Sequence, residues 1–151
     1  MGYFAEALAT EARGSLNRGV LTGLCENRVS FVSRDDVAAA AAGILLGDGH
    51  EGAIYTATSD QRFTGAERAA LIAEITRRPM SFLPLPEDHL RGGLAQAGLS
   101  DTLVNAVIAI QQRFVAGAFD LVTGDVEQLS GRPPKGLRDV LETALRQPPS
   151  H

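Results

Sequence analysis

Apolar residues recur along the chain with two spacings, and these predict an alternation of helices and strands. Near the start the interval is four residues, at Phe4, Leu8, Ala12 and Leu16, which predicts an amphipathic helix over residues 3–16. Similar patterns predict further helices over residues 37–46, 65–77, 87–97, 101–119 and 123–129, and a last one from residue 137. Short extended runs predict strands over residues 29–32, 53–58 and 80–83, with residues 20–23 as a further extended piece.

Hydrogen-bonding residues stand where three of these helices are expected to start. Ser33 or Asp35 can cap the helix over residues 37–46, and Ser100 precedes the longest predicted helix. Thr64 and Glu67 have the spacing of a capping box. The helix over residues 101–119 carries an apolar stripe, at Leu103, Val107, Ile110 and Phe114, which we expect in a core or an interface rather than in a ligand channel.

The order of these elements indicates an α/β fold with a small sheet of about three strands and six to seven helices. The strands over residues 53–58 and 80–83 flank a helix, so we expect them to pair as a right-handed crossover. The predicted domain covers residues 1–146, and residues 147–151 form a flexible tail. A sheet this small has edges that need a partner, which favours a homodimer or higher oligomer.

Composition narrows the class of protein. The 151 residues and 15.9 kDa fit one domain, and the net charge of −4 with no basic patch argues against a nucleic-acid partner. No apolar run is long enough for a membrane span, so we expect a soluble, cytoplasmic protein. The lone cysteine, Cys25, excludes an intrachain disulfide and a multi-cysteine zinc site, and the three histidines are not spaced for a shared metal.

Three glycines match the spacing of a dinucleotide-binding loop, G-x-G-x-x-G, at Gly47, Gly49 and Gly52. A phosphate cradle needs these glycines after a strand and at the start of a helix, where backbone amides meet the pyrophosphate. Here they follow a predicted helix and precede a predicted strand. We therefore interpret the segment as a helix end and a turn.

Five segments carry a resemblance to a known family: residues 2–8 (GYFAEAL), 29–42 (VSFVSRDDVAAAAA), 50–58 (HEGAIYTAT), 64–67 (TGAE) and 131–134 (GRPP). In this order they resemble NmrA-like atypical short-chain dehydrogenases, and most of all the branch of NAD(P)H:quinone oxidoreductases and azoreductases. The resemblance covers the C-terminal half of such a protein. It implies that the N-terminal half, with the βαβ unit and its glycine fingerprint, is missing.

The missing half determines what the chain is expected to bind. The superfamily's Tyr-x-x-x-Lys pair is also absent, because the position four residues before Lys135 is Gly131. The resemblance therefore implies that the chain alone binds no cofactor. NAD(P)H would enter only through a partner that supplies the nucleotide-binding half.

Five residues are candidates for a substrate site. The resemblance places Tyr3 and Phe4 at the edge between cofactor and substrate, as a wall for an aromatic or quinone-like molecule; the alternative is core packing of the first helix. Glu6 is either an acid–base group or a solvated helix charge. Arg34 follows the strand over residues 29–32 and can orient a carbonyl oxygen or form an ion pair. His89 is the best candidate for proton transfer, unless it is simply exposed.

Three functions from different classes remain open, and the sequence does not decide whether the chain is an enzyme. The first is the substrate-binding half of a quinone oxidoreductase, redox-active only with a nucleotide-binding partner. The second is a cofactor-independent cyclase, isomerase or hydrolase acting on a polycyclic or quinone-like metabolite. The third is a non-enzymatic regulator or binding protein. If a pocket is present, we expect it between the first helix and the end of the strand over residues 29–32, and a collapsed or solvent-filled pocket would favour the third function.

Overall fold

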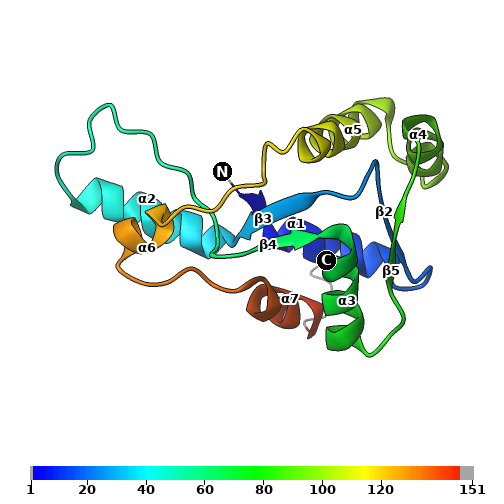
Figure 1. The fold of residues 1–151 in the computed structure, drawn as a ribbon, viewed down its shortest axis with the longest axis horizontal. Coiled ribbons are helices and arrows are strands. Elements are labelled where there is room, and N and C mark those ends of the chain that lie inside the picture. Colours follow the sequence, from blue (N-terminus) through cyan, green and yellow to red (C-terminus); the bar gives the residue numbers. More distant parts are fainter. Residues whose placement is uncertain (1, 147–151) are drawn as a thin grey trace.

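The computed structural model describes residues 2–146, which form two small sheets and seven helices (Figure 1). The larger sheet has the order β1-β3-β4, with β1 (Tyr3–Phe4) parallel to β3 (Arg28–Val32) and β4 (Arg62–Thr64) antiparallel to it. The second sheet pairs β2 (Val20–Gly23) with β5 (Ser81–Pro84) in parallel. The expected α/β fold with a small three-stranded sheet is confirmed.

Seven helices surround these strands: α1 (Ala5–Ser15), α2 (Arg34–Leu46), α3 (Gly65–Thr76), α4 (Glu87–Gln96), α5 (Asp101–Val115), α6 (Asp125–Ser130) and α7 (Leu137–Arg146). Helices α2 and α6 pack together at one end of the long axis, and α4 and α5 pack together toward the other end (Figure 1). Helix α1 runs between them and packs against α7. No helix within residues 2–146 is long and apolar enough to cross a membrane.

The main core lies between α1, β3, α3 and α7. Its fully buried members include Leu8, Phe31, Ile72 and Leu141, one from each of these elements. A smaller cluster of Leu90, Val104 and Ile108 joins α4 to α5. These two clusters leave a space between α1 and the α4–α5 pair, and that space becomes the cavity described below.

The predicted helix starts are confirmed in detail. The Ser33 hydroxyl accepts a hydrogen bond from the backbone of Asp36 at 3.0 Å, so Ser33 rather than Asp35 is the cap. Thr64 and Glu67 form the reciprocal capping box, with distances of 3.1 and 2.8 Å. Ser100 caps α5. These caps work because each supplies an acceptor to amides that the first helical turn leaves unpaired.

The predicted strand over residues 53–58 is wrong, and so is its crossover pairing with residues 80–83. Residues 53–58 are extended, but strand β4 lies further along, and residues 81–84 pair with β2 instead. The backbone bonds of this extended segment are isolated ones, from Ala53 N to His50 O at its start, and from Gly2 N to Ala57 O and from Ser59 N to Phe31 O at its end. Ile54 is 93% exposed because no described layer covers it.

Several helix boundaries and one helix face also differ from the sequence prediction; α2, for example, begins at Arg34 and not at residue 37. Tyr3 and Phe4 pair with β3 as a strand, so α1 begins at Ala5. Helix α5 ends at Val115, because Gly117 adopts a left-handed conformation with φ of 74°. The buried face of α5 carries Val104, Ile108 and Phe114, whereas Leu103 is 56% exposed. The predicted tail over residues 147–151 lies outside the described residues.

Candidate functional site

A cavity of about 520 Å³ lies between α1, α4 and α5. Its apolar wall consists of side chains from these three helices: Ala7, Leu90, Leu94, Ala97, Val107, Ile110 and Phe114. The polar residues of the lining include Tyr3 on β1 and Thr10 and Glu11 on α1, so they lie on one side of the cavity. An apolar space with a few convergent polar groups is typical of sites that bind small organic molecules.

Aromatic rings make the floor of this cavity rigid. The Tyr3 ring meets Phe114 edge to face at a centroid distance of 5.0 Å, and Phe119 and Phe31 at 6.1 and 6.2 Å. Phe114 and Phe119 also pack edge to face at 5.2 Å. Interlocked rings of this kind hold each other in place. Tyr3 thus lies in an aromatic cluster with Phe114 and not with Phe4, and its role as a wall for a substrate stays a prediction.

An ionisable cluster stands beside the rings. Burial raises the pKa of Tyr3, and the charge of Glu11 raises it further, so the phenol stays protonated at neutral pH. Glu11 is exposed to solvent where it lines the cavity. Desolvation by the surrounding protein raises the pKa of Glu11, and the nearby Arg68 opposes that effect by lowering it.

Arg68 is a buried cation behind the cavity floor and only 6% exposed. Its guanidinium donates to the Asn27 Oδ1 atom at 2.8 Å and to the Thr64 carbonyl at 3.2 Å. It also lies over the rings of Phe82 and Phe114, at 5.6 and 5.9 Å from their centroids. Burial lowers its pKa, while the charges of Glu11 and Glu26 raise it. Arg68 thus places a positive charge behind the aromatic floor.

The sequence-predicted residues Phe4, Glu6 and Arg34 come together, but outside this cavity. The Arg34 guanidinium lies over the Phe4 ring at 5.5 Å, and the Arg34 backbone donates to Glu6 Oε1 at 3.0 Å. Glu6 lines a separate hollow of about 430 Å³ with Asp35 and other residues at the end of β3. Neighbouring residues of a strand point to opposite faces, which explains why Tyr3 and Phe4 separate.

His89 lies in the first turn of α4 and is exposed, and it does not line the cavity, although the next residue, Leu90, does. Its role in proton transfer stays a prediction. Glu11 is the residue that sequence reasoning missed. A signal was present, because Tyr3, Ala7 and Glu11 recur at intervals of four, next to the stripe that starts at Phe4.

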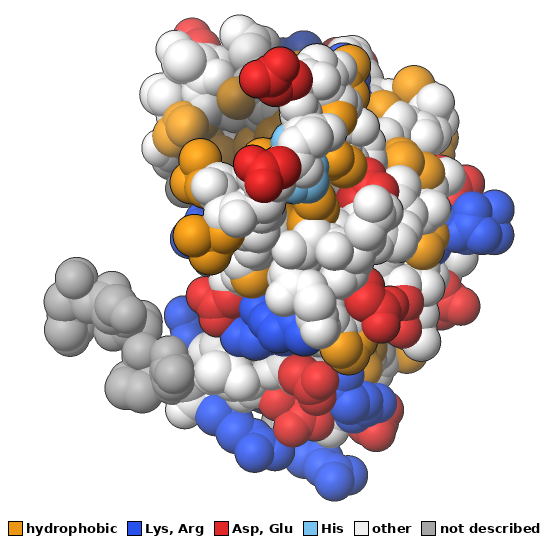
Figure 2. Space-filling view, turned by 90° about the vertical axis from the view of Figure 1, so that its left-hand side faces the viewer, with side chains coloured by type: hydrophobic (Ala, Val, Ile, Leu, Met, Phe, Trp, Pro, Cys, Tyr) orange, Lys and Arg blue, Asp and Glu red, His pale blue; other side chains and the backbone are white. Residues whose placement is uncertain are grey.

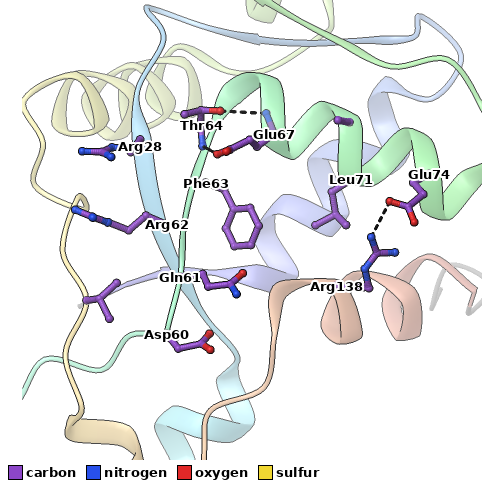
Figure 3. A pocket seen from close by; sticks show the side chains of 12 residues that line it. Arg28, Asp60, Gln61, Arg62, Phe63, Thr64, Glu67, Leu71, Glu74 and Arg138 are labelled. Carbon is purple, nitrogen blue, oxygen red and sulfur yellow. Dashed lines mark hydrogen bonds and ion pairs between the residues drawn. The ribbon is translucent and has the colours of Figure 1, made fainter.

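A larger hollow of about 790 Å³ lies beside β4 and α3 (Figure 3). Its arginines are paired with carboxylates. Arg28 and Arg62 both reach Asp120, at 3.3 and 3.0 Å, and Arg138 reaches Glu74 at 2.7 Å. Because these charges neutralise each other, we interpret the hollow as a surface network. No group of three metal-binding side chains occurs in the part of the chain that the structure describes.

Known proteins resemble this chain in sequence and in fold. No protein-family model matches the chain. The chain is 33% identical over 129 residues to a (4-alkanoyl-5-oxo-2,5-dihydrofuran-3-yl)methyl phosphate reductase of Streptomyces griseus, covering 85% of this chain and 45% of the relative. It is 27% identical over 137 residues to an NAD(P)H azoreductase of Xenophilus azovorans, covering 87% and 46%. The chain therefore spans about half the length of the curated relatives it matches.

Solved structures match this chain over a similar share of their length. The structure superimposes on an NADPH-dependent quinone oxidoreductase of Escherichia coli with a TM-score of 0.89 and 24% identity, over 95% of this chain and 52% of that protein. The chain therefore shares the α/β fold of one part of these reductases, and it corresponds to about half of their length.

Proposed function

We propose that this chain forms the substrate-binding half of an NAD(P)H-dependent reductase that acts on flat, conjugated acceptors such as quinones or azo compounds. The nucleotide-binding half comes from outside these 151 residues. The relatives support this proposal, because they are reductases and the chain matches about half of each. The observation that carries it is the 520 Å³ cavity between α1, α4 and α5, whose volume falls in the range of small-molecule sites.

The residues present do not fit a dinucleotide. The only glycines with the fingerprint spacing follow the C-terminus of α2, and Gly49 and Gly52 adopt left-handed turn conformations, with φ of 80° and 71°. A helix C-terminus presents carbonyl oxygens and the negative end of the helix dipole, which repel a pyrophosphate. We therefore assign to this chain only the binding and orientation of the substrate.

Exposed apolar side chains support a contact with a further protein surface. Leu45 and Leu46 at the end of α2 are 84% and 89% exposed, and Ile54 follows in the next loop. The space-filling view of this end shows hydrophobic side chains gathered in its upper part with some acidic ones among them, and most of the basic side chains lie below (Figure 2). We propose that the nucleotide-binding half, or a second copy of the chain, covers this apolar surface.

A second function is favoured by one observation. Glu11 and Tyr3 line the cavity together, and both have raised pKa values, so a proton donor stands beside a rigid aromatic floor. That arrangement suits acid–base catalysis without a cofactor, such as isomerisation of a conjugated ketone. Phe4, Arg34 and His89 do not line this cavity, so the cofactor-independent enzyme stays the second candidate.

The experiment for the proposed function is a binding titration on the 151-residue chain. The probe is 2,3-dimethyl-1,4-naphthoquinone, whose substituted quinone ring leaves the exposed Cys25 thiol no free ring position to attack. Equilibrium dialysis should show saturable binding. The Ala7→Phe variant, which fills the cavity from α1, should lose it, while Ala66→Phe on the exposed start of α3 should keep it. Equal binding by both variants, or none by the parent chain, would refute the proposal.

A further inference from the structure

The cavity wall contains one acidic side chain among the described residues, that of Glu11. It projects from the middle of α1, one helical turn beyond Ala7 and two beyond Tyr3. No group within residues 2–146 forms a hydrogen bond or an ion pair within 4.0 Å with its carboxyl group, whereas the other carboxylates near the cavity, such as Glu87, are tied to neighbours. Glu11 is therefore free to bond to a molecule in the cavity.

Few charged or titratable groups face Glu11. Tyr3 on β1 and Arg68 on α3 interact with it electrostatically, and Arg18, which follows α1, lines the same cavity. The described lining residues from α4 and α5 are apolar except for the neutral Gln111. The carboxyl group thus faces apolar side chains of α4 and α5 across the cavity, while Glu11 itself remains exposed to solvent.

We infer that Glu11 is the residue that selects the ligand, by donating a hydrogen bond from its protonated carboxyl group to a carbonyl oxygen of a flat aromatic molecule in the cavity. This inference rests on the proposed function, since it specifies the substrate of the same cavity. The ligand lies against the Tyr3 and Phe114 rings, and its carbonyl points toward α1. The matching class is a conjugated ketone or quinone.

The electrostatics agree with this geometry. Burial favours the neutral form of Glu11, and the neutral form is the one that has a proton to donate. The affinity for a carbonyl ligand therefore falls as the pH rises through the pKa of Glu11. Burial and the charge of Glu11 raise the pKa of Tyr3 above its ordinary 10.0, so Tyr3 does not produce such a profile.

The experiment compares two ligands that differ only in their carbonyl groups, 2,3-dimethyl-1,4-naphthoquinone and 2,3-dimethylnaphthalene, by equilibrium dialysis against the parent chain. The Glu11→Leu variant should bind the quinone about tenfold more weakly, as expected for the loss of one hydrogen bond. It should bind the hydrocarbon as the parent does. The Glu11→Gln variant keeps a donor, so its affinity should stay within about threefold of the parent's affinity at the acid end of the pH profile and should not change with pH.

Two controls make the result specific. Circular dichroism shows whether each variant is folded; if Glu11→Leu does not fold, the pH profiles of the parent and of Glu11→Gln decide. The His89→Gln variant should keep the parent's pH profile, because His89 lies outside the cavity.

Two contrary results have different meanings. If the quinone binds the parent and Glu11→Leu equally and without pH dependence, or if Tyr3→Phe alone removes the preference for the quinone, the inference is overturned and the proposed function stands. If the parent binds neither ligand, the proposed function itself is refuted, and the inference with it.

Discussion

The buried guanidinium of Arg68 gives the sharpest prediction about stability. Arg68→Ala removes a side chain that donates to Asn27 at 2.8 Å and to Thr64 at 3.2 Å and that contacts the rings of Phe82 and Phe114. Hydrogen bonds from a charged donor contribute about 1.5–3 kcal/mol each, and a buried cation–π contact contributes about 1–2 kcal/mol. These contributions are not additive.

The removal of one partner from a buried charged network costs about 3–5 kcal/mol, so we expect Arg68→Ala to lower the free energy of unfolding by that amount. Arg68→Met keeps most of the apolar volume and should lose less. The matched control is Arg91→Ala on α4, where the ion pair with Glu87 is exposed, and where we expect a loss of about 1 kcal/mol or less.

Urea unfolding at pH 7, followed by circular dichroism, measures these differences. If Arg68→Ala costs no more than Arg91→Ala, Arg68 does not anchor the floor of the cavity. In that case the charge of Arg68 behind Phe114 does not stabilise the site. The explanation of the Glu11 pKa would then lack the positive charge that it assigns to Arg68.

Four further predictions follow from the same structure. Because burial raises the pKa of Glu11 above its ordinary 4.5, its contribution to stability is complete below that pH and is lost as the pH rises through the raised value; urea unfolding at several pH values should show this slope in the parent and not in Glu11→Gln. Leu141→Ala in the main core should cost about 2–5 kcal/mol in the same assay. Nicotinamide fluorescence should show no saturable binding of NADPH at low micromolar concentration. Light scattering after size exclusion should show a dimer or larger oligomer, and a 16 kDa monomer at all concentrations would contradict this.

Local signals in the sequence predict most elements of this fold. The caps at Ser33, Thr64 and Ser100 depend on hydrogen bonds within four residues, so the sequence around them suffices to place α2, α3 and α5. Residues 53–58 show the limit of such reasoning. Their composition is that of a strand, but a strand also needs a paired neighbour, and the neighbouring segments of this structure supply only isolated backbone bonds.

The candidate site was predicted only in part, because a site depends on which helix faces meet. The role of Tyr3 as a wall for a substrate stays a prediction; its ring contacts Phe114, which lies 111 positions away, and the sequence does not show that α5 turns that face toward α1. Phe4 and Arg34 do meet, as neighbours at the end of β3 should. Glu11 was missed since its raised pKa comes from elements that are distant in sequence.

The most direct test of the substrate-binding role is to map the bound quinone by nuclear magnetic resonance. Amide chemical shifts of the labelled 151-residue chain are recorded during titration with 2,3-dimethyl-1,4-naphthoquinone. The account predicts saturable shifts that converge on the cavity, at Ala7, Leu94 and Val107, with one dissociation constant. Shifts confined to the charged hollow around Arg62, or no saturable shifts, would contradict it.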